Sequence, residues 1–177
     1  MENRILDIRI LYDVISNEGN CEVQHKLDMD IINHICLYGV NIMCSTNFKK
    51  SLDFIQHGNI SVLEHSLSVA YMSLWLVKKL HLNVDKKSLV RGALLHDYFL
   101  YDWHTNNGHP LHGFTHPKTA LDNANRDFHI NKIESDIILK HMFPLNIKPP
   151  MYKESMIVCL ADKISATIET ILFRKSR

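Results

Sequence analysis

Five short motifs place histidine and aspartate side chains among apolar residues. Each motif lies within a segment whose apolar residues have helical spacing, or at the start of such a segment. An imidazole or carboxylate in apolar surroundings must be paired or coordinated, because leaving it bare costs several kcal/mol or shifts its ionisation. Such groups on separate helices can meet at one point and hold a metal. In chain order the motifs are LEHSLSVA with His65, LLHDYF with His96 and Asp97, FTHPKTA with His116, LKHMF with His141, and LADKIS with Asp162.

The adjacent pair His96-Asp97 is the centre of this pattern. Neighbouring residues on a helix point about 100° apart. One metal can therefore take both side chains only above the helix end, or Asp97 can bridge two metals with its two oxygens. His116 and His141 could complete a second metal position. Two ions roughly 3.5–4 Å apart clamp the oxygens of a transferred phosphoryl group and lower the pKa of a bridging water.

In this order and context, the motifs resemble those of the HD-domain metal-dependent phosphohydrolase superfamily, over roughly residues 55–170. The two additional histidines make the chain similar to the binuclear subset, which includes HD-GYP phosphodiesterases and diadenosine-tetraphosphate hydrolases of the YqeK type. The resemblance implies a helical bundle with metals buried between the helices. It implies a first metal at His65, His96, Asp97 and Asp162, and a second at Asp97, His116 and His141.

The ligands suit a divalent transition metal, with two ions expected, but ligand type does not choose among Fe, Mn, Ni, Co and Zn. In the family that the chain resembles, a Lys or Arg after the last Asp often reaches substrate phosphate, which makes Lys163 a candidate. Asp97 and Lys163 are the predicted catalytic residues. Asp102 and His104, in the segment after the HD pair, could bind substrate or transfer protons to it. His57 could contact substrate or be a turn residue. The sequence HDYFLYDWH lacks GYP, which argues against a cyclic-dinucleotide phosphodiesterase.

The resemblance thus implies a phosphohydrolase that acts on a nucleotide or another small phosphate ester or anhydride through a metal-activated hydroxide. Two alternatives stay open. Some HD-domain proteins with the same six ligands are di-iron oxygenases, and an intact metal site could also serve a non-catalytic nucleotide-binding sensor. A single histidine in an apolar helix is more often a hydrogen-bonded core residue than a ligand, so the interpretation depends on the joint pattern.

The composition limits which other classes of protein the sequence could belong to. Of 177 residues, 46% are hydrophobic and 22% charged, and the formal net charge is +1, so no basic field favours a nucleic-acid polymer. No run of 18 apolar residues predicts a membrane span, and the N-terminus lacks the pattern of a signal peptide. The four cysteines have no CxxC spacing, which indicates reduced thiols in a cytoplasmic protein. We expect a monomer or a homodimer.

The hydrophobic periodicity predicts an all-α fold, with residues 1–177 forming one HD domain and N-terminal helices at about 4–52 packed on the motif region. Asp28, Ser61 with Glu64, Asp85 and Asn131 are the expected helix starts, and Pro117 is expected at a first helical position. The residues after the HD pair are expected to form a long functional loop whose aromatic residues pack it down or stack a base. Trp75 is expected in the core, and the histidines outside the motifs are expected at the surface, in packing or as loop contacts. Helices are expected over about 4–16, 28–44, 48–55, 61–80, 85–98, 117–127, 131–141 and 153–173, with the loop at 99–115.

Overall fold

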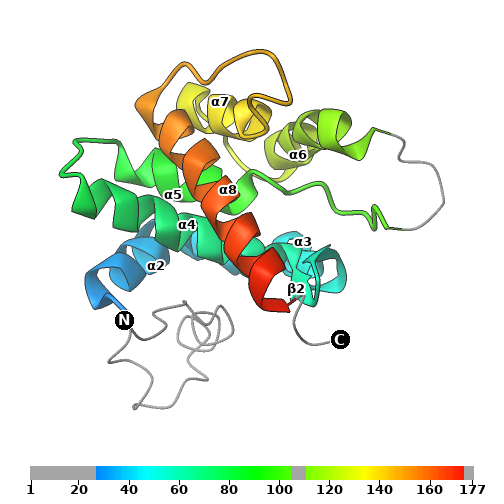
Figure 1. Cartoon of the computed structure of the whole chain (residues 1–177), viewed down its shortest axis with the longest axis horizontal. Helices are drawn as coiled ribbons and strands as arrows, with labels where there is room; N and C mark the ends of the chain where they lie inside the picture. The colour runs from blue at the N-terminus through cyan, green and yellow to red at the C-terminus, as the bar shows by residue number, and fades with distance from the viewer. Residues whose placement is uncertain (1–26, 105–110, 174–177) are drawn as a thin grey trace.

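The structure, a computed structural model, describes residues 27–104 and 111–173 and is mainly helical, so the predicted all-α class is confirmed (Figure 1). The helix predicted over 4–16 lies outside the described residues, as do Cys21, His25 and His109. Among the described helices, none has the length and apolar character needed to cross a bilayer. The main helices are α2 (Met29–Met43), α4 (Val62–Lys79), α5 (Lys86–Leu95), α6 (His112–Asp127), α7 (Lys132–Lys140) and α8 (Lys153–Phe173).

Side-chain caps explain where several of these helices begin. Ser61 and Glu64 form the expected capping box at the start of α4, and the Asp28 side chain accepts a hydrogen bond from the Asp30 amide at the start of α2. Asn131 begins α7 with a second capping box that uses Glu134. These caps satisfy amides that the first helical turn leaves without partners.

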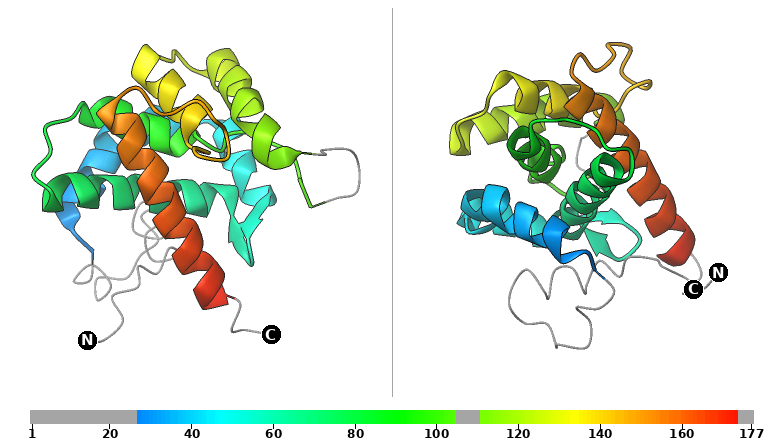
Figure 2. Two further views of the ribbon diagram at one scale, coloured as in Figure 1. Left: turned by 45° about the horizontal axis from the view of Figure 1, so that its top comes forward. Right: turned by 90° about the vertical axis from the view of Figure 1, so that its left-hand side faces the viewer.

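The helices pack around α4 and α5 (Figure 2). Helix α4 packs against α5 and α8, α5 also packs against α2 and α7, and α7 packs against α6 and α8. Figure 1 shows α8 crossing α4 and α5 obliquely. Leu67, Leu94 and Ile138 are almost fully buried where these helices meet, and each such side chain stabilises the fold by roughly 1.5–3 kcal/mol through burial.

Helices α5 and α7 approach each other closely, and this contact fixes the ends that carry His96 and His141. A Cβ atom on Gly92 would lie 2.4 Å from Ile137 Cδ1, so only glycine fits this spacing without a shift. Beside it, the buried Arg91 Nε donates to Glu134 Oε1 at 2.7 Å. Removal of either partner would leave the other charge buried and unpaired, which is strongly destabilising.

Residues 46–61 differ from the single helix that was predicted over 48–55. Helix α3 (Thr46–Lys49) continues into a short 3-10 helix (Lys50–Asp53), and two strands follow, β1 (Ile55–His57) and β2 (Ile60–Ser61), which pair antiparallel. Gly58 turns the chain between them with a positive φ of 58°, a conformation that glycine adopts without strain. This hairpin brings β1 to the start of α4.

Two further predictions were wrong. Helix α6 begins at His112, and Pro117 lies inside it instead of at its first position. Proline has no N–H to donate to the Gly113 carbonyl, yet the helix continues on both sides of Pro117. Trp75 is not in the core, because 39% of it is exposed on the outer side of α4. Lys79 Nζ lies 5.9 Å from the centre of its ring, a cation–π distance.

Candidate metal centre

All six candidate ligands meet where α4, α5, α6, α7 and α8 converge. His65 lies in the first turns of α4, while His96 and Asp97 directly follow α5. Their ligand-type atoms form compact groups: those of His65, His96 and Asp162 lie within 4.8 Å of one another, as do those of His96, Asp97 and His141. The side chains are buried, with between 0% and 8% of each residue exposed: His65, His96, Asp97, His116, His141 and Asp162.

The Asp97 carboxylate lies between two sets of imidazoles. Its Oδ2 atom is 3.8 Å from His65 Nε2 and 3.3 Å from His96 Nε2. Its Oδ1 atom is 3.1 Å from His116 Nε2 and 3.3 Å from His141 Nε2. One oxygen therefore faces each set, which is the arrangement expected of a carboxylate that bridges two metals. Asp162 belongs to the first set, since its Oδ1 lies 3.1 Å from His65 Nε2.

Backbone carbonyls set the tautomer of three of these histidines. A carbonyl oxygen can only accept, so each Nδ1 atom must carry a hydrogen, and the neutral ring then has its lone pair on Nε2. The Nε2 lone pairs point into the cluster, as in histidines that bind metals. The hydrogen bonds run from His96 Nδ1 to Ala93 O (2.7 Å), from His116 Nδ1 to His112 O (2.8 Å), and from His141 Nδ1 to Ile138 O (2.8 Å).

Several polar atoms of the cluster lack a suitable partner among the described residues. Among the described residues, His96 Nε2 and Asp97 Oδ1 are buried without a hydrogen-bond partner. His116 Nε2 and His141 Nε2 lie only 2.8 Å apart, and two neutral rings in these tautomers would direct lone pairs at each other. A proton or a cation removes this repulsion. The nitrogen and oxygen donors therefore fit divalent transition metals.

The charges of the cluster reinforce this fit. Burial lowers the pKa of His65 and of His96, but nearby carboxylates outweigh it. Glu169 and Asp162 hold the pKa of His65 well above its usual value, and Asp97 and Asp162 raise the pKa of His96 to about 9. Although burial raises the pKa of Asp97, the His96 charge and hydrogen bonds hold it well below its usual value. Hydrogen bonds from His65 and His96 likewise hold the pKa of Asp162 below its usual value despite its burial. Asp97 and Asp162 are thus ionised and attract positive charge, which a metal can supply in place of protons.

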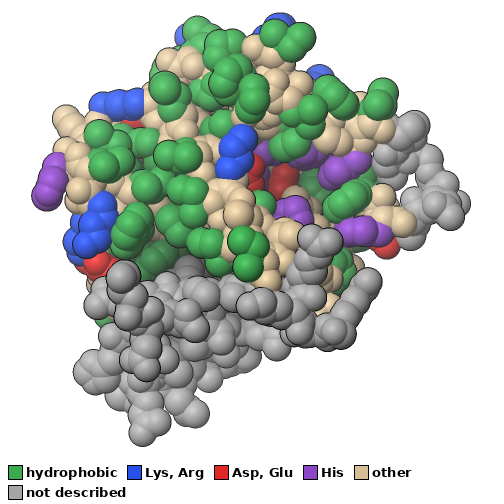
Figure 3. All heavy atoms as spheres, in the orientation of Figure 1, with side chains coloured by type: hydrophobic (Ala, Val, Ile, Leu, Met, Phe, Trp, Pro, Cys, Tyr) green, Lys and Arg blue, Asp and Glu red, His purple; other side chains and the backbone are tan. Residues whose placement is uncertain are grey.

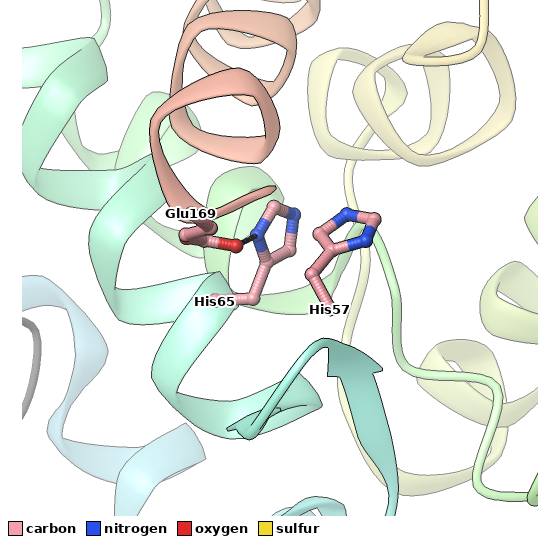
Figure 4. Close-up of side chains that lie close together, drawn as sticks. All are labelled: His57, His65 and Glu169. Carbon is pink, nitrogen blue, oxygen red and sulfur yellow. Dashed lines mark hydrogen bonds and ion pairs between the residues drawn. The ribbon is translucent and has the colours of Figure 1, made fainter. Parts of the chain in front are cut away.

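Two further residues that contact the cluster, Glu169 and Gln56, were not predicted from the sequence. Glu169 Oε2 accepts a hydrogen bond from His65 Nδ1 at 2.8 Å, which leaves the His65 Nε2 atom for the cluster (Figure 4). Gln56 Nε2 donates to Asp97 Oδ2 at 2.6 Å. A signal for Glu169 existed, because it lies seven residues after Asp162 and so on the same face of α8. Gln56 carries no such signal, because its partner is 41 residues away.

His57, the predicted substrate contact on β1, lies beside the first set of ligands. Its ring packs edge-on against that of His65, with the ring centres 5.3 Å apart (Figure 4). His57, His65 and Glu169 form a third group of ligand-type atoms within 4.8 Å of one another. Burial, helped by the His65 charge, lowers the pKa of His57. A neutral His57 can accept or donate a hydrogen bond near the cluster.

A cavity of about 590 Å³ opens onto the cluster and is lined by His57, Asp97, Asp162 and Lys163, among others. Figure 3 shows histidine and carboxylate side chains together in a hollow on this face of the molecule. Lys163 Nζ is held near the cluster by the His141 carbonyl, to which it donates at 2.9 Å. The cavity volume is typical of a small-molecule site.

The other two predicted substrate contacts lie elsewhere. Asp102 and His104 are exposed, and the Asp102 carboxylate accepts a hydrogen bond from the His104 amide at 2.9 Å. Neither lines the cavity, whereas Trp103 between them and His112 at the start of α6 do.

A family model described as HD domain matches residues 62–167, a range that includes all six candidate ligands and excludes Gln56, His57 and Glu169. No curated protein and no solved structure matches the chain.

Proposed function

The chain belongs to the HD domain family, a superfamily of metal-dependent phosphohydrolases, and we propose that it hydrolyses a small phosphorylated molecule with two divalent ions. The observation that carries the proposal is the placement of the two Asp97 oxygens, one toward each set of imidazoles. The first ion would be held by His65, His96, Asp97 and Asp162. The second would be held by Asp97, His116 and His141.

The ions would supply charge that stabilises the phosphoryl oxygens and would lower the pKa of the attacking water. The chain's own residues prepare the site for this chemistry. Gln56 orients the Asp97 carboxylate, and Glu169 orients the His65 ring. Lys163 carries a positive charge at the cavity wall, where a substrate phosphate would lie. Because these groups are held in place beforehand, they need little rearrangement during the reaction.

The test combines metal analysis with phosphate release. Protein purified without chelator is analysed for transition metals and incubated with nucleotides and simple phosphate esters. We expect about two ions per chain and metal-dependent release of phosphate. Asp97→Ala, which removes the shared carboxylate, should abolish release. His129→Ala is the matched control, because the His129 side chain is exposed and is not one of the candidate ligands.

Full activity in Asp97→Ala would contradict the proposal. An absence of phosphate release together with oxygen uptake in iron-loaded protein would favour the di-iron oxygenase instead. Nucleotide binding without turnover would favour the sensor.

A further inference from the structure

The walls of the cavity differ chemically from its floor. The floor is formed by candidate ligands, while the walls include Met142, Pro144 and Leu145 from the connection between α7 and α8, with Ala166 from α8. Gly113 of α6 also lines the cavity. A Cβ atom added there would lie 3.1 Å from Leu145 Cδ2. The apolar connection and α6 therefore face each other closely across part of the cavity.

Few polar side chains on these walls could recognise a nucleotide. Apart from the candidate ligands, the polar residues of the described lining are Gln56, His57, His112 and Lys163. Among the described residues that line the cavity, there is no serine, threonine, asparagine or arginine, and Lys163 is the one lysine. Gln56 already donates to Asp97, and its Oε1 atom is buried. A base edge or a ribose hydroxyl group placed against these walls would lose hydrogen bonds to water without replacing them.

Trp103 does not provide a free surface for stacking a base. Its ring packs against His112, with the ring centres 4.8 Å apart and the planes within 7°, and against His104 at 3.8 Å. Its Nε1 atom is buried, so it offers no donor to the cavity. The indole therefore adds apolar wall and no polar recognition.

We infer that the substrate is a phosphate monoester whose alcohol part is apolar, either a hydrocarbon chain or an aryl group. This inference rests on the proposed function, because the metal cluster must bind the phosphate. The metal site could hold one phosphate, whereas the further phosphates of a polyphosphate would extend over the walls. The one lysine of the described lining, Lys163, already donates to the His141 and Cys159 carbonyls. The apolar part would bury against Met142, Pro144 and Leu145, which gives specificity through the hydrophobic effect.

The first experiment compares substrates on the metal-loaded protein. The panel contains methyl, butyl, hexyl and phenyl phosphate, AMP, ATP and diadenosine tetraphosphate. We expect kcat/KM to rise roughly fourfold for each methylene that becomes buried between methyl and butyl phosphate. Hexyl and phenyl phosphate should exceed AMP, and the two polyphosphates should be the poorest substrates.

The second experiment changes the wall. Leu145→Asn should lower kcat/KM for hexyl phosphate about tenfold, which is the range of one or two buried methylenes, and leave methyl phosphate within about twofold. Leu160→Asn is the matched control. Leu160 is 50% exposed on α8 and Leu145 is 46% exposed, but only Leu145 lines the cavity. The control should change neither substrate.

Two results would overturn the inference while leaving the proposed function in place. One is a nucleotide that is hydrolysed more efficiently than hexyl and phenyl phosphate. The other is an equal effect of Leu145→Asn on hexyl and methyl phosphate. Absence of phosphate release from every compound in the panel would overturn both the proposed function and this inference.

Discussion

Glu169→Gln should weaken divalent metal binding about 10- to 100-fold, although Glu169 is not one of the candidate ligands. The Glu169 carboxylate is 1% exposed and accepts the hydrogen of His65 Nδ1 at 2.8 Å. Substitution of an outer partner of a metal-binding histidine typically has an effect of this size. It corresponds to about 1.4–2.7 kcal/mol of binding free energy. Glutamine keeps an oxygen that can accept the same hydrogen bond, so the substitution removes mainly the negative charge.

The assay is a competition titration with a chromophoric chelator, using Mn²⁺, Co²⁺ and Zn²⁺ in turn. The matched control is Glu154→Gln on the same helix. Glu154 is also buried, at 3% exposed, and its Oε1 accepts a hydrogen bond from the Asp85 amide at 2.9 Å. It precedes Asp162 by eight residues, about 12 Å along a helix. We expect the control to lower stability and leave the metal dissociation constants unchanged.

Binding of each metal by Glu169→Gln within about twofold of the unchanged protein would refute this prediction. That result would mean that the negative charge of Glu169 has no influence on metal binding at the cluster. Equal losses of affinity in both variants would also refute it, because they would trace the effect to helix α8 as a whole.

Three other predictions concern the second metal, the packing of α5 on α7, and pH. His116→Ala should retain about one ion per chain and lose activity by roughly 100-fold or more, and metal analysis showing two ions would exclude His116 as a ligand. Arg91→Leu leaves Glu134 buried without its partner and should lower the free energy of unfolding by about 3–5 kcal/mol, measured by urea denaturation. In the metal-free protein the pKa of His96 is about 9, above its ordinary value of 6.5. The stability contributed by this raised pKa is therefore fully present below about pH 6.5 and is lost as pH rises toward 9, whereas metal affinity should increase over the same window because binding displaces the proton. Chelator competition at several pH values tests this, and an affinity that stays constant between pH 6.5 and 9 would count against it.

Local signals predicted most helices well because they depend on residues close in sequence. The Ser61–Glu64 capping box and the Asp28 cap join atoms two or three residues apart, and the structure contains both. The start of α6 was mispredicted by an equally local rule. Proline is favoured at a first helical position, but Pro117 lies inside a helix that begins at His112. A preference at one position does not exclude a longer helix around it.

The candidate ligands could be found from the sequence because each lies in a recognisable motif, whereas their supporting residues could not. Glu169 and His65 are 104 residues apart, and their hydrogen bond depends on how α8 crosses α4. The exposure of Trp75 also could not be predicted from local sequence. Its helical spacing fits a core position, yet no described helix covers it closely enough to bury it, and 39% of it stays exposed. Contacts between distant helices decide both cases.

The ends of α5 and α7 show how the fold itself prepares a cation site. The last carbonyls of a helix have no amide partner within the helix. His96 and His141, each just after its helix, donate their Nδ1 hydrogens to two such carbonyls, those of Ala93 and Ile138. The same hydrogen bonds direct both Nε2 atoms into the cluster. The C-terminal ends of both helices also carry partial negative charge, which favours cations. The same two hydrogen bonds therefore cap the helices and orient the candidate ligands. We expect the orientations of these two imidazoles to be established as the helices form, before any metal binds.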